Sequence, residues 1–311
     1  MRAMPGRVER RTRELLAKRA HFAAILPLAQ PFTPDVEDLV SRMERAVEGS
    51  GARVLLHPEM RKIEAAEKGG GALSFLNKPT DTKMLFVVID HVGIFIAARD
   101  GVMEHRGTLG AWANPEVWPE GPAEISKHRA WVEIADLGFM RDRGVEQLDS
   151  AFNRAAAVTA ATAAVVEAAS PLGVLWHPAT NALSPQRFTD QFSRVIKGEA
   201  PVELWLRYIT LKPEDMRDNE GVITNGLAPF TGCEIEVLPS SMSKDNARAL
   251  AFDFARLVID RGAVPRTGMV VNINRGFSAT VRVGESAVHR GVNVYELTVE
   301  KRAVATAGDR T

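Results

Sequence analysis

Cysteine, net charge and long apolar runs are the features that this 311-residue sequence most clearly lacks. The single cysteine, Cys233, excludes an internal disulfide framework and a metal site built from several thiolates, which fits a reducing compartment. Basic and acidic residues both number 39, so no net charge would attract nucleic acid or an anionic membrane. The longest apolar runs, 84–89 and 92–98, are too short to cross a membrane. We therefore expect a cytoplasmic protein that binds neither.

The two ends of the sequence differ in composition from the rest. Residues 1–20 hold seven basic and two acidic residues without an apolar core, which argues against a secretory signal. We expect a basic N-terminal segment over 1–20 that is solvated, with docking on an acidic partner as the alternative. Residues 301–311 are small and polar, which predicts a disordered tail.

An apolar strand, a proline-marked loop and a capped helix occur three times along the chain. The strands are 22–26, 174–176 and 235–238, and the expected helix caps are Thr33, Ser184 and Ser243. Pro34 and Pro185 follow the first two caps at the position where a helix tolerates proline. These two copies lie about half a chain apart, with the same spacing from the preceding proline, which predicts a duplicated fold.

The segments between these copies read mostly as strands. Alternation and apolar runs predict strands at 84–89, 92–98, 130–135, 202–211, 269–273, 279–283 and 292–299, and an alanine-rich helix over 145–169. The fold class is therefore α+β, with mostly antiparallel sheets and helices packed on one face. We expect two duplicated ferredoxin-like (split βαβ) halves, residues 21–170 and 171–300. Segment 51–80 reads as an irregular insertion.

Several segments resemble the bacterial family catalogued as domain of unknown function 4261. They run in the family's order from residue 21 to about 300: AILPLAQPFTPDVEDLV, WPEGPAEISKHRAWVEIADLG, GVLWHPATNALSPQRF, GLAPFTGCEIEVLPSS and TVRVGESAVHRGVNVYELTVE. Trp131 stands where such proteins tend to have a second histidine after His128, and 266–269 departs from their usual Asp-Gly-Glu-Thr. The resemblance implies a fold and a bacterial, cytosolic origin. It implies no reaction, since the family has no established activity.

The motifs of common cofactor and catalytic sites are missing from the sequence. Gly69–Gly71 lacks the Lys-Ser/Thr that a phosphate-binding loop needs, and no serine stands in a Gly-x-Ser-x-Gly elbow. No two of the seven histidines are three or four residues apart, as one helical metal site would require. Cys233 has no sequence cue for a paired base and reads as a small buried hydrophobe. We expect no cofactor and no metal.

A pair of carboxylates is the first candidate for a site. Glu234 and Glu236 lie on one predicted strand, so they share a face, about 7 Å apart. Such a pair can perform acid–base chemistry or hold a cation. The simpler alternative, which plain alternation favours, is that the acidic face of this strand is in water.

Two further candidates combine aromatic and polar residues. Trp176, His177 and Asn181 lie where a strand ends before a helix begins, a place that often gathers polar ligands, although aromatic residues beside a proline turn usually pack. Trp118 and His128 form the other group, with His128 facing away from its basic, solvated neighbours.

Three functions are consistent with the sequence. The first is a non-enzymatic protein-binding or interaction protein from a stress, immunity or secretion-associated locus, whose mark would be an exposed apolar patch. The alternative is an enzyme with a site built from Glu234, Glu236, His128 and His177. The third is a structural subunit that pairs edge strands with another copy of itself. The expected partner is thus another protein or a second copy.

Overall fold

The computed structural model describes residues 21–56, 82–103, 109–137, 150–211, 220–239, 242–263, 265–273 and 277–301. The chain forms two compact units that divide between Trp205 and Leu206, here the N-terminal and C-terminal units. The predicted basic segment 1–20, the tail beyond 301 and most of the insertion lie outside the described residues.

The N-terminal unit is built on a seven-stranded sheet in which every pairing is antiparallel. Its strands lie in the order β2-β3-β4-β5-β1-β6-β7. They are β1 (Ala23–Leu28), β2 (Val54–Leu56), β3 (Thr82–Ile89), β4 (Val92–Asp100), β5 (Ala130–Asp136), β6 (Val174–His177) and β7 (Asn181–Leu183). The expected hairpin is confirmed: β3 and β4 turn at Asp90 and His91, both with positive φ.

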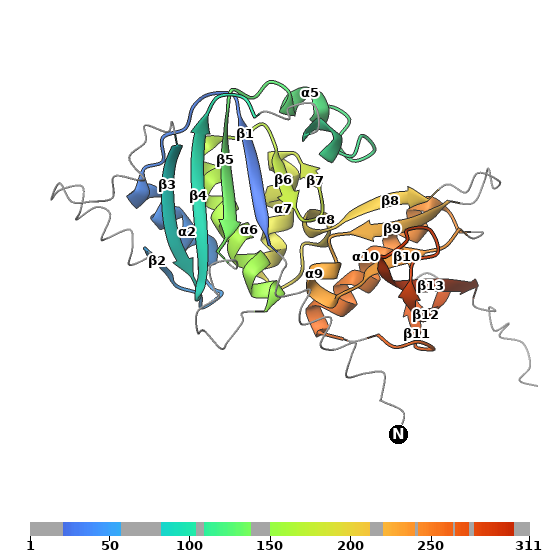
Figure 1. Ribbon diagram of the computed structural model, residues 1–311. Coiled ribbons are helices and arrows are strands. Elements are labelled where there is room, and N and C mark those ends of the chain that lie inside the picture. Colours follow the sequence, from blue (N-terminus) through green and yellow to red (C-terminus); the bar gives the residue numbers. More distant parts are fainter. Residues whose placement is uncertain are drawn as a thin grey trace, which may run out of the picture. The chain divides into compact units, whose positions relative to one another are not determined.

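Helices cover one face of this sheet (Figure 1). They are α2 (Val36–Val47), α6 (Ala151–Ala169) and α7 (Pro185–Ile196), followed by the short α8 (Val202–Trp205). The alanine-rich α6 packs on β1, β4 and β5 and contacts α2 and α7. Its small alanine side chains allow this close approach, and the helix is buried on several sides as a result.

In the N-terminal unit, one predicted helix cap is confirmed and another is wrong. Ser184 caps α7 as predicted, accepting a hydrogen bond from the amide of Arg187. The expected cap at Thr33 is wrong, because α2 begins at Val36 and Asp35 accepts from the Asp38 amide at 3.0 Å. An aspartate accepts the same hydrogen bond and adds a negative charge at the positive end of the helix dipole.

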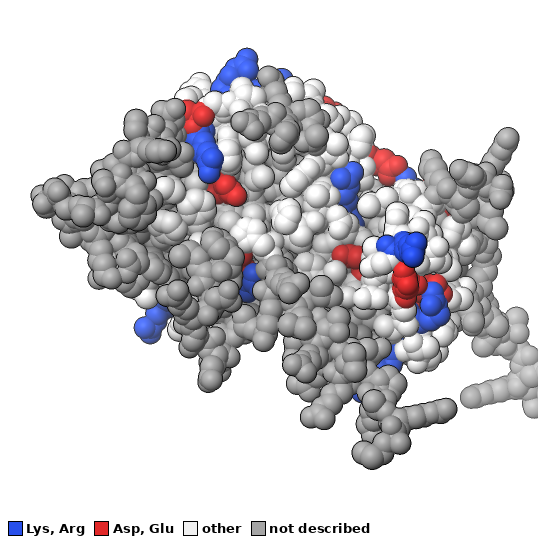
Figure 2. All heavy atoms as spheres, in the orientation of Figure 1, with Lys and Arg blue, Asp and Glu red and all other residues white. Residues whose placement is uncertain are grey.

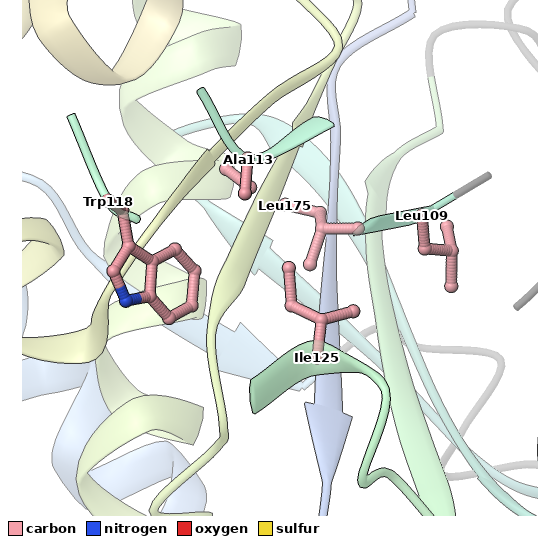
Figure 3. Close-up of a cluster of buried hydrophobic side chains, with 6 residues drawn as sticks. Leu109, Ala113, Trp118, Ile125 and Leu175 are labelled. Atoms are coloured by element: carbon pink, nitrogen blue, oxygen red, sulfur yellow. The ribbon is translucent and has the colours of Figure 1, made fainter. Parts of the chain in front are cut away.

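A short segment covers the opposite face where β6 and β7 lie. It contains the 3-10 helix η1 (Gly110–Trp112) and α5 (Gly121–Ile125). Figure 3 shows its side chains converging with Leu175 of β6 in a buried apolar cluster, with Trp118 among them. A Cβ atom on Gly121 or Gly173 would lie within 2.8 Å of the Trp118 ring, so both glycines are required by this packing.

The C-terminal unit has a six-stranded sheet in the order β11-β12-β13-β10-β9-β8. Its elements are β8 (Arg207–Leu211), β9 (Gly221–Asn225), α9 (Ala228–Thr231), β10 (Glu234–Val237), α10 (Lys244–Arg261), β11 (Val270–Ile273), β12 (Phe277–Glu285) and β13 (Asn293–Lys301). Among the described strands of this sheet, only β10 and β13 pair in parallel. The predicted strand 202–211 is correct only in its second part, because 202–205 form α8.

One helix packs on a face of this second sheet. Ser243 caps α10 as predicted, and Gly262 ends it in the left-handed conformation with φ of 57°. Phe254 of α10 is buried and meets the ring of Tyr295 on β13 edge to face, 5.9 Å between centroids. The predicted inward stripe of this helix is thereby confirmed at its centre.

The fold is α+β, with mostly antiparallel sheets, but the predicted halves are not the two units. The second copy of the repeated device, β6 with α7, belongs to the first sheet because β6 pairs with β1, so the boundary lies at 205/206 and not at 170/171. The first and third copies occupy matching places. In each unit a central strand, β1 or β10, leads into a helix and then a meander that returns beside that strand.

Candidate functional site

The residues singled out in the sequence lie in both units, and several of them are buried in their own unit's core. His128 is fully buried, with Nδ1 2.8 Å from the carbonyl of Ile125 and Nε2 3.1 Å from the amide of Met103. Because an amide can only donate, Nε2 accepts and the ring proton is on Nδ1. Both ring nitrogens are thus used to hold the segment that carries Trp118.

The β6–β7 group divides between core and surface. Trp176 is fully buried, with its ring centroid 6.3 Å from Phe22 and 6.4 Å from Trp205. Asn181 is paired opposite Trp176 and donates from Nδ2 to the carbonyls of Glu203 and Leu204, which ties β7 to α8 within the same unit. His177 is exposed at the end of β6, and its partial removal from water lowers its pKa.

A histidine and an aspartate meet beside His177, and sequence reasoning missed them. The end of β5 and the start of β1 are neighbours, so His21 Nδ1 lies 3.0 Å from Asp136 Oδ1. Asp136 is fully buried, and its other oxygen accepts from Nε of the buried Arg154 at 2.5 Å. The His21 and His177 rings lie 6.4 Å apart. The two residues of the pair are 115 positions apart in sequence, and only the strand register brings them together.

Glu234 is not solvated, contrary to the simpler expectation. The residue is 7% exposed, and its carboxylate accepts four hydrogen bonds, from Thr224 Oγ1 at 2.8 Å and from three consecutive backbone amides, residues 226–228, at 3.0–3.1 Å. Burial raises its pKa, and these four donors act in the opposite direction. The side chain ties β10 to the loop that starts α9, so all its acceptor sites serve the fold.

Glu236 is also buried rather than in water, and it belongs to a row of charges across three strands. It accepts from Ser286 Oγ at 2.9 Å and from the amide of Ala287 at 3.2 Å. Glu296 lies beside it in register on β13 and pairs through both oxygens with Arg282 on β12. The expectation of an acidic face in water is therefore wrong, because the loop 286–292 and a neighbouring arginine cover these carboxylates.

One surface of the N-terminal unit has no helix on it among the described residues. On β2, β3, β4 and β5, alternate side chains point away from α2 and α6, and we call this surface the open face. Its side chains are Leu55, Met84, Phe86, Val88, Phe95, Arg99, Trp131 and Glu133. Leu55 is 58% and Met84 38% exposed. The residues that alternate with them along β2 and β3 face the helices and are buried. Figure 2 shows the described atoms over these strands as mostly uncharged.

Two charged side chains interrupt the apolar open face. The Arg99 guanidinium lies 4.9 Å from the centroid of the Trp131 ring, a stacked arrangement. Glu133 is half-buried, directly opposite Ile25 on one neighbouring strand and Ala97 on the other. Within the described part of the chain, its carboxylate has neither a hydrogen bond nor an ion pair.

Comparisons of the chain with protein-family models, with curated proteins and with solved structures gave no match. In the described segments, no helix combines the length and apolar character needed to span a membrane. The same segments contain no group of three or more His, Cys, Asp or Glu arranged to hold a metal ion. The candidate site is thus defined by geometry alone: the open face, with His21, Asp136 and His177 at the ends of its neighbouring strands.

Proposed function

We propose that this protein is a binding protein that holds another polypeptide on the open face of its N-terminal sheet. The observation that carries the proposal is the half-buried carboxylate of Glu133 within an apolar surface, which has no hydrogen bond or ion pair among the described residues. The resemblance to the bacterial family named above, with a cytoplasmic setting in a stress, immunity or secretion-associated locus, is part of the same proposal.

The physical chemistry of the open face supports binding in two ways. Apolar surface gains about 25 cal/mol for each Å² removed from water, and contiguous exposed apolar patches commonly mark interaction sites. The stacked Trp131 and Arg99 are of the residue types that dominate binding energies at protein interfaces. Glu133 then defines the partner, since a carboxylate that loses its water on binding needs a cation. The partner surface should therefore be apolar with a Lys or Arg among its contacts.

A selection from a phage-displayed library of random dodecapeptides tests the proposal. We expect enriched peptides with apolar residues around a Lys or Arg, whose binding is lost in Trp131→Asp and weakened at least about tenfold in Glu133→Gln. Val288→Asp is the matched control, because Val288 is 51% exposed in the C-terminal unit. Peptides that bind the control and the Trp131 variant equally would contradict the proposal.

The His21–Asp136 pair favours a second candidate, an acid–base site. A buried aspartate that fixes the proton on Nδ1 leaves Nε2 as the basic atom of the imidazole, the arrangement used by general bases. Hydrolysis of p-nitrophenyl acetate provides a probe: the imidazole takes the acetyl group as nitrophenolate leaves, and water then cleaves the acetylimidazole to acetate and the free ring. His21→Gln should lower the rate at least about tenfold relative to His91→Gln, since His91 has an 88% exposed side chain. Equal rates would remove this candidate.

A further inference from the structure

The charges of the open face point to a specific partner. Resting on the proposed function, we propose that the polypeptide on the open face is a second copy of this chain, packed sheet to sheet about a twofold axis. In this dimer Arg99 of each copy pairs with Glu133 of the other.

The strand register places these two charges as diagonal neighbours. Arg99 on β4 lies opposite Trp131 on β5, and Glu133 lies opposite Ala97, two residues further along each strand. Diagonal positions of this kind are about 7–8 Å apart. In the described part of the chain neither side chain has an ion-pair partner, although their charges are opposite.

A twofold axis requires a surface that is complementary to itself. A face with one positive and one negative charge, set side by side in apolar surroundings, meets this requirement, because the rotation brings the positive charge of one copy over the negative charge of the other. A foreign partner would need both charges at the same spacing, whereas a second copy has them by identity. Glu133 and Arg99 would then be paired in two symmetric ion pairs.

The apolar part of the face suits packing of two sheets. Phe86 and Phe95 are cross-strand neighbours, with ring centroids 5.3 Å apart, and Val88 continues the surface along β3. Facing sheets pack about 10 Å apart through side chains of this size. Strands β3, β4 and β5 are each about 25 Å long and the three-residue β2 about 10 Å, and together they give a face roughly 15–20 Å wide. Two such faces would bury on the order of 1,000 Å², the lower limit for a specific interface, so we expect a dimer that dissociates on dilution.

Charge exchange tests this pairing directly. In sedimentation equilibrium the wild-type chain should change from monomer to dimer over the micromolar range. Glu133→Arg and Arg99→Glu should each weaken dimerisation at least about tenfold, because like charges then meet twice across the axis. An equimolar mixture of the two variants should form a heterodimer, and the chain with both substitutions should dimerise like the wild type. Arg290→Glu, an exposed change in the C-terminal unit, is the control.

The outcomes separate this inference from the proposed function. A wild-type chain that stays monomeric to about 1 mM, or single variants that dimerise as well as Arg290→Glu, would overturn the second copy as partner. If the peptide selection still yields binders that need Trp131, the open face remains a binding surface for a different protein. Circular dichroism of each variant establishes that it is folded, so a loss of dimer in an intact chain is a loss of the interface.

Discussion

Replacing Glu234 with glutamine should destabilise the C-terminal unit, although the change removes only a charge. The carboxylate accepts from the amides of Gly226 and Ala228 on one oxygen, and from Thr224 Oγ1 and the Leu227 amide on the other. Glutamine offers one oxygen and one NH₂ group. Whichever way the amide turns, its NH₂ hydrogens face at least one backbone N–H that can only donate.

The magnitude follows from the orientation that loses least. With the amide oxygen toward Gly226 and Ala228, the Leu227 amide becomes a buried donor without an acceptor, which costs about 1–3 kcal/mol. The hydrogen bonds that remain lose the extra strength of a charged acceptor, about 1 kcal/mol each. Relief from burying a charge offsets part of this loss, because burial disfavours the ionised form of Glu234. We expect a net loss of about 2–4 kcal/mol.

Urea unfolding followed by circular dichroism measures this difference. Glu48→Gln is the matched control, since Glu48 is exposed at the end of α2 and the same substitution there should change stability by less than about 0.5 kcal/mol. A Glu234→Gln chain as stable as the control would refute the assignment of the carboxylate as a cap for the 226–228 amides.

Four further outcomes follow from the structure. Glu236→Gln should lower the free energy of unfolding by about 1–2 kcal/mol in the same urea assay, and an unchanged stability would contradict the burial of Glu236. Phe254→Ala should cost about 3–5 kcal/mol, and a loss below about 1 kcal/mol would contradict its burial. Gly173→Ala should cost about 1–3 kcal/mol by displacing Trp118, with unaltered stability as the refuting result. An NMR titration should place the pKa of His177 below its ordinary value. Because the unfolded chain then binds the proton more tightly, His177 lowers the stability of the fold as the pH drops below about 6.5. The His177→Gln chain should not show this loss of stability.

The local part of the fold could be predicted because short-range chemistry determines it. Ser184 and Ser243 cap their helices as the sequence indicates, since the cap hydrogen bond joins residues three apart. The hairpin at Asp90–His91 follows from two apolar runs on either side of a two-residue turn. Burial of Phe254 and Cys233 follows from apolar periodicity and from the character of a lone cysteine.

The errors arise where contacts distant in sequence decide the structure. Alternation correctly placed Glu234 and Glu236 on one face of a strand, but nothing local shows that a loop 50 residues away covers Glu236. The matching proline spacing suggested two halves, whereas pairing of β6 with β1 joins both copies in one sheet. The His21–Asp136 contact depends on the β1–β5 register, which no motif in the sequence marks.

The two sheets have a common plan but satisfy their charges differently, and this contrast is the physical reason to look for a partner at the N-terminal unit. In the C-terminal sheet, Glu234 and Glu236 are held by donors of the same unit and Glu296 by Arg282. Each of these carboxylates thus has a hydrogen-bond or ion-pair partner within its own unit. In the N-terminal sheet, Asp136 is satisfied in the same way by Arg154, while Glu133, three residues earlier on β5, has no such partner in the described chain. Glu133 and its diagonal neighbour Arg99 have no ion-pair partner in the described chain, and the same two groups on a second copy would complement both charges.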